Sequence, residues 1–235
     1  MKQTAIVTGG AKRLGKSIAL FLAKKGYDIV LHYNHSQSDA NSVVHEIQSM
    51  GRDAISVSYD LSHPDSATKL MRDAVSFCRD VSVLIHNASV FSPHSFFETT
   101  PAIFDENMTI HFKTPFFLTQ AFAKYASSGQ IVTLLDTRIA THDPTFFSYT
   151  LSKKALSNFT QLCARALGPK FRVNGICPGS ILAASHEDSD QPPTHNPLQT
   201  SGSPDDITRA VGYLLDSPFV TGELLFIDGG AAVNF

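Results

Sequence analysis

The sequence predicts an α/β fold: a single-domain, doubly wound sheet of about seven parallel strands with helices on both faces. Apolar runs rich in β-branched residues alternate with segments of helical periodicity along the whole chain. No linker of different composition interrupts the alternation, so residues 1–235 are expected to form one domain. With 235 residues, 43% of them hydrophobic, the chain can bury one large core but has little room for a separate substrate domain.

Seven apolar runs are expected to form the strands, at residues 3–8, 28–32, 54–59, 81–85, 131–135, 171–176 and 224–227. Helices are expected between them, at residues 14–25, 40–50, 64–79, 103–126, 149–167 and 203–215. Gly26 and Gly51 follow two of these helices, and Ser203 and Pro204 begin the last with a capping hydroxyl and a proline at the first position. Because strands joined by helical crossovers run parallel, this order favours a parallel sheet covered on both faces.

The composition argues against several classes of function. The formal net charge is −2 and the basic residues are scattered, which disfavours a nucleic-acid surface or a polybasic membrane patch. No apolar run reaches membrane-spanning length, and the amino terminus has no signal-peptide pattern. Cys78, Cys163 and Cys177 lie far apart, so we expect no disulfide framework and a cytoplasmic location. The ten histidines show no zinc-ligand spacing, so no metal site is predicted.

Residues 178–202 do not fit the alternation, since they are rich in Ser, Pro, His and acidic residues. A loop of this length inside a compact domain usually has a function. We interpret the segment as a lid over the ligand site, and a disordered insertion without a role is the alternative.

A glycine-rich turn joins the first strand to the first helix, with the sequence TGGAKRLG at residues 8–15. Glycine permits a tight turn and lets backbone N–H groups approach a pyrophosphate closely. The helix that follows adds the positive end of its dipole. This position in a doubly wound sheet favours a dinucleotide-binding turn over a plain tight turn.

The turn resembles the TGxxxGxG motif of the short-chain dehydrogenases/reductases, with Arg13 at the position of the middle glycine. Further segments resemble motifs of the same family, in the family's order and over the whole chain. They are Asp60-Leu61, His86-Asn87-Ala88-Ser89, the YxxxK motif from Tyr149 to Lys153, residues 173–179, Thr221-Gly222 and Asp228-Gly229-Gly230. The resemblance implies a Rossmann fold that binds a nicotinamide dinucleotide.

The nicotinamide cofactor is predicted to be NADPH rather than NADH. NAD-binding sites place an acid after the second strand, but here no carboxylate follows that strand before Asp39. Lys12, His35 and Ser36 offer the positive charge and the hydroxyl that a 2′-phosphate prefers. The residues that the resemblance places against the cofactor are Gly9, Lys12, Arg13, Leu14, Gly15, His32, Tyr33, Asn34, His35, Ser36, Asp60, Leu61, Asn87, Ala88, Ser89, Lys153, Pro178, Gly179 and Ser180.

Tyr149 and Lys153 are the candidate catalytic pair. Of the six tyrosines, only Tyr149 has a lysine four residues later, and this spacing places both side chains on one face of a helix. The nearby ammonium is expected to lower the pKa of the phenol, which then donates a proton as hydride reaches the substrate. Lys153 can also bond the nicotinamide ribose. The alternative, an exposed polar pair without a role, is disfavoured by the position after the fifth strand.

Asp136 lies thirteen residues before Tyr149, where most members of the family carry serine. A hydroxyl suits a carbonyl oxygen that becomes an alkoxide, whereas a carboxylic acid suits protonation of a ring nitrogen during reduction of a C=N bond. Thr133 and Thr137 are hydroxyl alternatives, but they are out of register. Asp136 and Arg13 together resemble the pteridine reductase and dihydromonapterin reductase branch of the family.

By the same resemblance, Phe91 stacks on a flat heterocycle, and the catalytic or substrate contacts are Arg13, Ser89, Phe91, Asp136 and Tyr149. Ordinary core packing is the alternative for Phe91, since the chain has 17 phenylalanines. His111 stands where a helix of the family carries an asparagine that holds a relay water. It is either part of a relay or a buried structural histidine.

The leading functional hypothesis is NADPH-dependent reduction of a pterin, dihydropterin or dihydrofolate-like ring. The alternatives are a carbonyl reductase that acts on a 3-oxoacyl thioester or small ketone, and a relative that binds NADPH without turnover. The segment at residues 115–126 and the helix from Tyr149 resemble the family's four-helix interface, which implies a homotetramer.

Overall fold

A computed structural model describes residues 3–63, 65–78, 80–182 and 196–233. One sheet of seven parallel strands runs through this part of the chain, in the order β3-β2-β1-β4-β5-β6-β7. The strands are β1 (Thr4–Val7), β2 (Asp28–Tyr33), β3 (Ala54–Ser58), β4 (Val81–His86), β5 (Gly129–Leu134), β6 (Phe171–Pro178) and β7 (Leu224–Ile227). The predicted fold class is confirmed.

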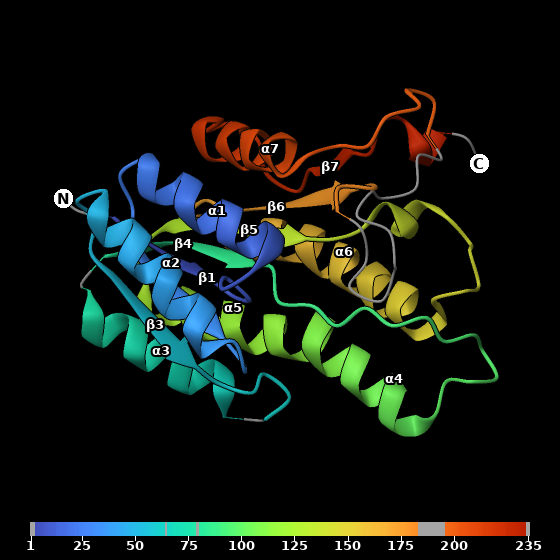
Figure 1. Ribbon diagram of the computed structural model, residues 1–235, viewed down its shortest axis with the longest axis horizontal. Coiled ribbons are helices and arrows are strands. Elements are labelled where there is room, and N and C mark those ends of the chain that lie inside the picture. The colour runs from blue at the N-terminus through green and yellow to red at the C-terminus, as the bar shows by residue number, and fades with distance from the viewer. Residues whose placement is uncertain (1–2, 64, 79, 183–195, 234–235) are drawn as a thin grey trace.

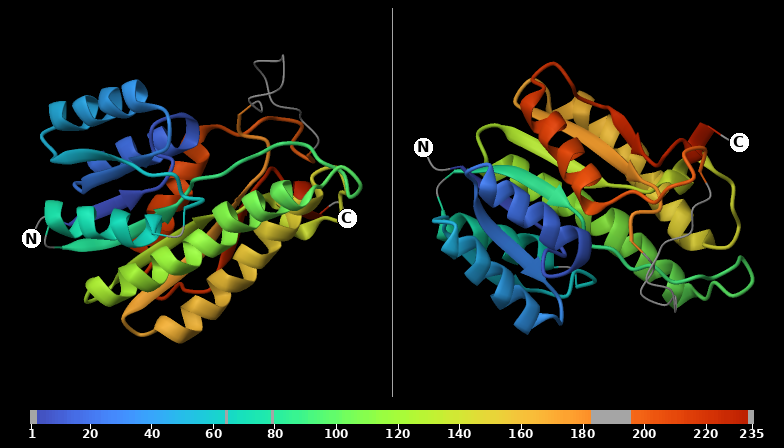
Figure 2. Two further views of the ribbon diagram at one scale, coloured as in Figure 1. Left: turned by 90° about the horizontal axis from the view of Figure 1, so that it is seen from below. Right: turned by 45° about the horizontal axis from the view of Figure 1, so that its top comes forward.

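Helices cover both faces of the sheet (Figures 1 and 2). One face packs against α1 (Arg13–Lys24), α2 (Gln37–Ser49) and α7 (Pro204–Asp216). The other face packs against α3 (Ser66–Phe77), α5 (Thr114–Tyr125) and α6 (Phe147–Leu167). A shorter helix, α4 (Pro101–Met108), precedes α5. The order of strands reverses between β1 and β4, and in sheets of this type the crevice outside the carboxyl ends of the strands at that point binds ligands.

The side chains of β1 show why both faces are covered. Ala5 and Val7 belong to the core beneath α1, α2 and α7, whereas Ile6 belongs to the core beneath α3 and α5. All three are fully buried. A strand buried on both faces needs apolar residues at every position, which explains the continuous apolar runs of the sequence. Full burial of a side chain such as Ile6 or Val7 stabilises the fold by roughly 1.5–3 kcal/mol.

The predicted helix at residues 103–126 is not continuous. It consists of α4, a π-helical turn η1 (Thr109–Lys113) and α5. Pro115 in the first turn of α5 explains the interruption, because it has no N–H to donate to the carbonyl of His111, four residues earlier. His111 lies in this π-helical turn and is 1% exposed.

A second local feature was not predicted from the sequence. After β5 the chain forms a short 3₁₀ turn, η2 (Thr137–Ala140), and the Asp136 carboxylate caps it by accepting the Arg138 backbone N–H at 2.8 Å. A similar turn, η3 (Ala231–Val233), follows β7.

Most of the predicted lid at residues 178–202 falls on residues 183–195, outside the described residues. The two ends of the segment are described. The Gly202 N–H donates to the Ser180 carbonyl at 3.0 Å, and the Leu198 N–H donates to the Gly229 carbonyl at 3.4 Å. The segment therefore begins and ends beside the carboxyl ends of β6 and β7.

Within the described residues, no helix is long and apolar enough to cross a membrane. The same part of the chain holds no group of three or more His, Cys, Asp or Glu side chains placed to bind a metal ion.

Candidate active site

The turn after β1 is braced by hydrogen bonds from the segment after β4. Asn87 Nδ2 donates to the carbonyls of Thr8 and Gly9, at 2.9 and 3.0 Å. The backbone N–H groups of Asn87 and Ala88 both donate to Thr8 Oγ1, at 2.9 and 3.0 Å. Asn87 and Ala88 were predicted to contact the cofactor. In the structure these donors bond to the turn itself, so both residues shape the binding turn.

His32, predicted to contact the cofactor, lies under the glycine-rich turn. It is 2% exposed. Its Nδ1 accepts the Gly9 N–H at 3.2 Å, and its Nε2–H donates to the Tyr59 carbonyl at 2.9 Å. Burial lowers the pKa of His32 to about 4, so the ring is neutral and links the turn to the end of β3. The neighbouring Tyr33 is buried as well.

The amino terminus of α1 has the features of an anion site. No side chain caps it, and its first turn holds no acidic residue. Backbone N–H groups at such an end can bind phosphate oxygens. A Cβ on Gly15 would lie 2.1 Å from the Gly9 carbonyl oxygen, so only glycine fits at this position of the first turn. Arg13 has a left-handed backbone (φ 51°), a conformation that non-glycine residues adopt at a cost of about 1–3 kcal/mol. These residues fit a dinucleotide diphosphate.

The predicted 2′-phosphate contacts surround the end of β2. Lys12 Nζ lies 3.1 Å from Asp39 Oδ2, and both side chains are about half exposed, with Lys12 at 56%. Asn34, His35 and Ser36 follow β2 directly and lead into α2. Asp39, the first carboxylate after β2, therefore pairs with Lys12, the predicted cationic contact of the 2′-phosphate.

The remaining predicted cofactor residues follow β3 and β6. Asp60 Oδ1 accepts the Ser62 N–H at 2.9 Å, and this bond lowers the pKa of the Asp60 carboxyl. The buried Leu61 receives a hydrogen bond on its carbonyl from Thr114 Oγ1, at 2.6 Å. The last group is Pro178, Gly179 and Ser180 at the end of β6, where a Cβ on Gly179 would lie 2.7 Å from the Asp228 Cα.

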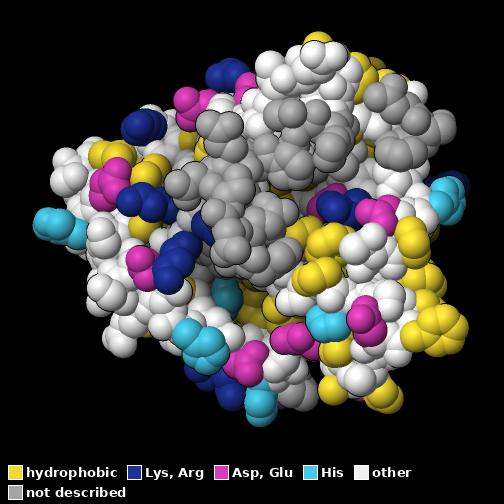
Figure 3. Space-filling model, turned by 45° about the vertical axis from the view of Figure 1, so that its right-hand side comes forward, with side chains coloured by type: hydrophobic (Ala, Val, Ile, Leu, Met, Phe, Trp, Pro, Cys, Tyr) yellow, Lys and Arg dark blue, Asp and Glu magenta, His cyan; other side chains and the backbone are white. Residues whose placement is uncertain are grey.

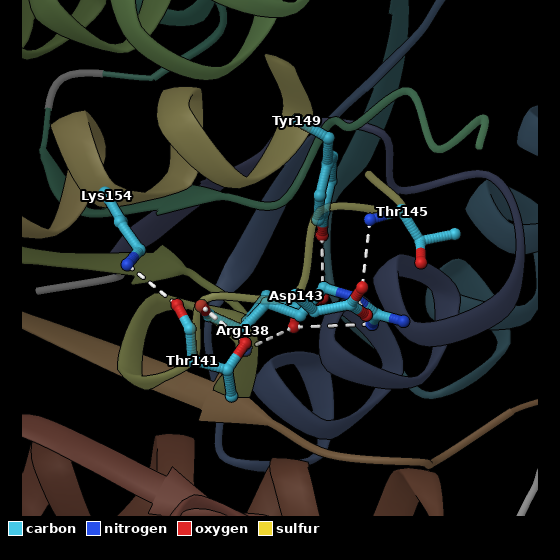
Figure 4. A network of polar contacts seen from close by, with 7 residues as sticks. Arg138, Thr141, Asp143, Thr145, Tyr149 and Lys154 are labelled. Atoms are coloured by element: carbon cyan, nitrogen blue, oxygen red, sulfur yellow. Dashed lines mark hydrogen bonds and ion pairs between the residues drawn. The ribbon is translucent and has the colours of Figure 1, made fainter. Parts of the chain in front are cut away.

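Tyr149 and Asp136 meet through a hydrogen bond. Tyr149, in the first turn of α6, donates from its Oη to Asp136 Oδ2 at 2.8 Å. Figure 4 shows the tyrosine pointing toward the η2 turn, which Lys154 also braces by donating to the Thr141 carbonyl at 2.8 Å. The thirteen-residue spacing thus brings the carboxylate to the phenol.

Thr133 and Thr137 do not substitute for the missing serine. Thr133 is fully buried and bonds Thr160, and Thr137 donates to Asp228 Oδ2 at 2.7 Å.

Lys153 is buried on the same helix face, but its ammonium donates to the Leu134 carbonyl at 2.7 Å. The nitrogen lies 5.7 Å from the centre of the Tyr149 ring. Burial and the neighbouring Asp136 hold the pKa of Tyr149 well above its usual range. The prediction that Lys153 lowers the pKa of the Tyr149 phenol is therefore wrong, because this pKa is raised. Burial lowers the pKa of Lys153 itself to about 8.

An aromatic stack lies beside Tyr149. Figure 3 shows hydrophobic side chains in a hollow on this side of the molecule. Phe91 stacks on Phe146 with ring centres 4.4 Å apart and an angle of 9°, and it meets Tyr149 edge to face at 4.9 Å. The Arg138 guanidinium lies 4.5 Å from the centre of Phe146 and 3.8 Å from both Asp136 and Asp143. Sequence reasoning left Phe146 undecided and missed Arg138, whose only sequence signal is its position two residues after Asp136.

Ser89, predicted to contact both cofactor and substrate, lies at the edge of this cluster. Its Oγ is 2.8 Å from Nε2 of the buried His111. The structure thus brings Ser89, Phe91, Asp136, Tyr149 and Lys153 to the carboxyl ends of β4 and β5, beside the braced turn after β1.

Comparison with known proteins agrees with this geometry. The family model of the short chain dehydrogenases matches residues 3–193. The FolM alternative dihydrofolate reductase 1 of Brucella suis, solved in complex with NADP, is similar with a TM-score of 0.94 and 32% identity, over 99% of this chain and 96% of that chain.

Two further similar proteins are named as other kinds of oxidoreductase. The landomycin C-6 ketoreductase LanV, solved with NADP and rabelomycin, has a TM-score of 0.90 and 26% identity over 99% of this chain and all of that chain (100%). The uncharacterized oxidoreductase MT0954 of Mycobacterium tuberculosis is 31% identical over 97% of this chain and 91% of its own length. With its sheet, turn and tyrosine–lysine pair, this chain belongs to the short-chain dehydrogenase family.

Proposed function

We propose that this protein uses NADPH to reduce a C=N bond in a pterin, dihydropterin or dihydrofolate-like ring. The general activity, NADP-dependent oxidation or reduction, follows from the short-chain dehydrogenase family and from the NADP bound in similar structures. The observation that carries the finer proposal is the 2.8 Å hydrogen bond from Tyr149 to Asp136.

The cofactor is NADP, and this chain has the groups that hold it. The backbone at the start of α1 and the turn after β1 would hold the diphosphate, and Lys12 would supply positive charge for the 2′-phosphate. Lys153 uses one donor on the Leu134 carbonyl and keeps others for the hydroxyls of the nicotinamide ribose. When bound, the nicotinamide supplies the hydride.

Tyr149 is the acid of the proposed reaction. Its raised pKa keeps the phenol protonated at neutral pH, so the proton is present at Oη when hydride reaches the substrate carbon. The phenol is placed by its bond to Asp136 and by the edge of Phe91.

Asp136 decides between two kinds of substrate. Both of its oxygens act as acceptors here, one for the Arg138 N–H and one for the Tyr149 hydroxyl. A serine hydroxyl can donate to a developing alkoxide, whereas both Asp136 oxygens already act as acceptors in this arrangement. Asp136 therefore suits a substrate with N–H donors, such as the amino edge of a pyrimidine, and disfavours a negative oxygen beside it.

The stack of Phe91 and Phe146 supports a flat substrate. Aromatic faces at this position favour a planar ring, and Arg13 and Ser89 are the proposed polar contacts. The FolM enzyme of Brucella suis, named as a dihydrofolate reductase, agrees with such a ring. A carbonyl reductase is the second candidate, because LanV is named as a ketoreductase.

Three further proposals concern the whole molecule. Large apolar side chains of α4, α5 and α6 are exposed, which supports self-association into a homotetramer through these helices; they include Phe104, Phe116, Phe117, Leu151 and Leu162. Residues 178–202 are proposed to close over the substrate, and the protein is proposed to act in the cytoplasm.

The test is NADPH oxidation with dihydrobiopterin, dihydromonapterin or dihydrofolate, and separately with an acetoacetyl thioester. Turnover of a pterin ring supports the proposal, and turnover of the thioester alone contradicts it.

The variant Asp136→Ser should lose pterin turnover. The matched control Asp143→Ser also removes a carboxylate beside Arg138, but Asp143 does not bond Tyr149, so turnover should persist. NADPH binding without any turnover would favour a non-catalytic relative.

A further inference from the structure

His111 is held by hydrogen bonds on both nitrogens of its ring. Nε2 lies 2.8 Å from Ser89 Oγ and 3.2 Å from the backbone nitrogen of Val90. Nδ1 lies 2.9 Å from Ser152 Oγ. The ring stands edge-on to Tyr149, with ring centres 5.2 Å apart. This histidine therefore connects the segment after β4 with α6, the helix that carries the catalytic tyrosine.

These contacts allow one arrangement of protons. Ser152 Oγ donates its hydrogen to the Tyr149 carbonyl at 2.7 Å, so it can only accept from His111, and Nδ1 must carry the ring proton. On the other side, the Val90 N–H can only donate, so Nε2 is unprotonated. Both sides of the ring agree on a neutral histidine with its proton on Nδ1.

The groups that face the ring favour this neutral form. Burial is the main cause that holds the pKa of His111 well below its usual range, and the Lys153 ammonium on α6 lowers it further. Backbone groups of Val90 and Asn107 oppose this shift. Tyr149, the other titratable group against the ring, keeps its own proton because burial raises its pKa.

We propose that His111 is a positioning residue of the reductase site and does not carry the proton that Tyr149 delivers. A relay through this ring needs a proton on Nε2, the nitrogen that faces Ser89, and that nitrogen acts as an acceptor. The ring instead holds Ser89 and Val90 against α6. Phe91 follows Val90 directly in the chain, so the same contacts set the position of Phe91 in its stack with Phe146.

The orientation of Ser89 follows from this arrangement. Its hydroxyl proton has acceptors within the protein: His111 Nε2 at 2.8 Å, the Val90 carbonyl at 3.2 Å and the Tyr149 phenol oxygen. Each of these choices uses the proton within the protein and leaves the oxygen lone pairs for a ligand. Ser89 is thus set to accept, and a ring N–H or an amino group fits it. The inference rests on the proposed reductase activity at Tyr149, but not on one particular ring.

The kinetic test uses His111→Asn with whichever substrate the wild-type protein turns over. Loss of the hydrogen bonds to the Ser89 segment should raise the substrate KM about 3- to 10-fold. The kcat should stay within about twofold, with the same pH profile as the wild type. In a Ser89→Ala background, His111→Asn should raise KM little further, since both changes act through one contact.

A relay predicts the opposite split, and that result would overturn the proposal: kcat falls, KM is unchanged, and a limb of the pH profile is lost. The matched control is His86→Asn, which removes another buried histidine, one that bonds Thr119. It should lower thermal stability and leave KM unchanged.

A second measurement needs no turnover. Nitrogen NMR of the protein with labelled histidine reports the tautomer of each ring, and His111→Asn or His111→Gln assigns the signal. We expect the Nδ1–H form from about pH 6 to pH 8 without titration. A proton on Nε2, or titration in this range, contradicts the proposal. If no pterin is reduced, the proposed substrate fails, while this spectrum still decides the role of His111.

Discussion

The nucleotide-binding half and the catalytic half of this site are built in different ways. Around the turn after β1, side chains bond to backbone atoms, as Asn87 does with the Gly9 carbonyl and His32 with the Gly9 N–H. Around Tyr149, side chains bond to and stack on one another. A site made of backbone groups depends on the path of the chain, whereas a site made of side chains depends on their chemical identity. Substitutions in the first half should therefore change cofactor binding, and those in the second half substrate binding or the chemical step.

The largest effect is expected for Tyr149→Phe. Removing the hydroxyl removes the proton donor and should lower kcat by about 10²–10⁴-fold, while the Kd for NADPH stays unchanged. Steady-state kinetics and fluorescence titration with NADPH measure the two quantities. Tyr125→Phe, at an exposed tyrosine, is the control. Loss of NADPH affinity in Tyr149→Phe would contradict the separation of the two halves.

Gly15→Ala tests the backbone-built half. The added Cβ would lie 2.1 Å from the Gly9 carbonyl oxygen, so the turn must shift. The Kd for NADPH should rise roughly 5- to 100-fold, from the usual cost of overpacking. Gly168→Ala is the matched control, because there the Cβ meets its nearest atom at an ordinary 3.4 Å. Equal affinities in the two variants would show that the turn is not shaped by this contact.

The pH dependence sharpens the comparison through Lys153. Its pKa is lowered to about 8 by burial, so the ammonium is lost above that pH and kcat/KM should fall about tenfold for each pH unit. Stability moves in the other direction. Between about pH 8 and the usual lysine pKa near 10.4, the unfolded chain binds more protons, so the free energy of unfolding rises with pH. Denaturant unfolding and kcat/KM across this range test both slopes, and Lys153→Met should remove the rise in stability.

The smallest effect is expected for Lys12→Ala. Lys12 is exposed and paired with Asp39, so solvent screens its charge. The Kd for NADPH should rise about 2- to 5-fold while the Kd for NADH does not change. Asp39→Asn should strengthen NADPH binding slightly, since it frees Lys12 from its partner. Isothermal titration with both cofactors measures this, and an equal loss for NADH would remove Lys12 from the 2′-phosphate site.

Much of the fold and part of the candidate site could be predicted from the sequence. Hydrophobic period is a local property, so the seven strands and most helices were found within a few residues. The four-residue step from Tyr149 to Lys153 was also readable, because residues four apart on a helix share one face. Asp136 was found by the resemblance to the family, as the residue at the position of its usual serine. The interruption before Pro115 had a sequence signal, the proline itself.

Tertiary structure alone decided which partners these residues meet. His32 lies beneath the turn because β2 packs beside β1 and β3. Phe91 meets Phe146, and His111 meets Ser89 and Ser152, only once β4, the π-helical turn and α6 are packed together. The pKa of Tyr149 likewise depends on burial, which a lysine four residues away does not reveal. Local periodicity determines where the chain forms helices and strands, whereas contacts between distant segments determine the protonation, orientation and stacking of the side chains they carry.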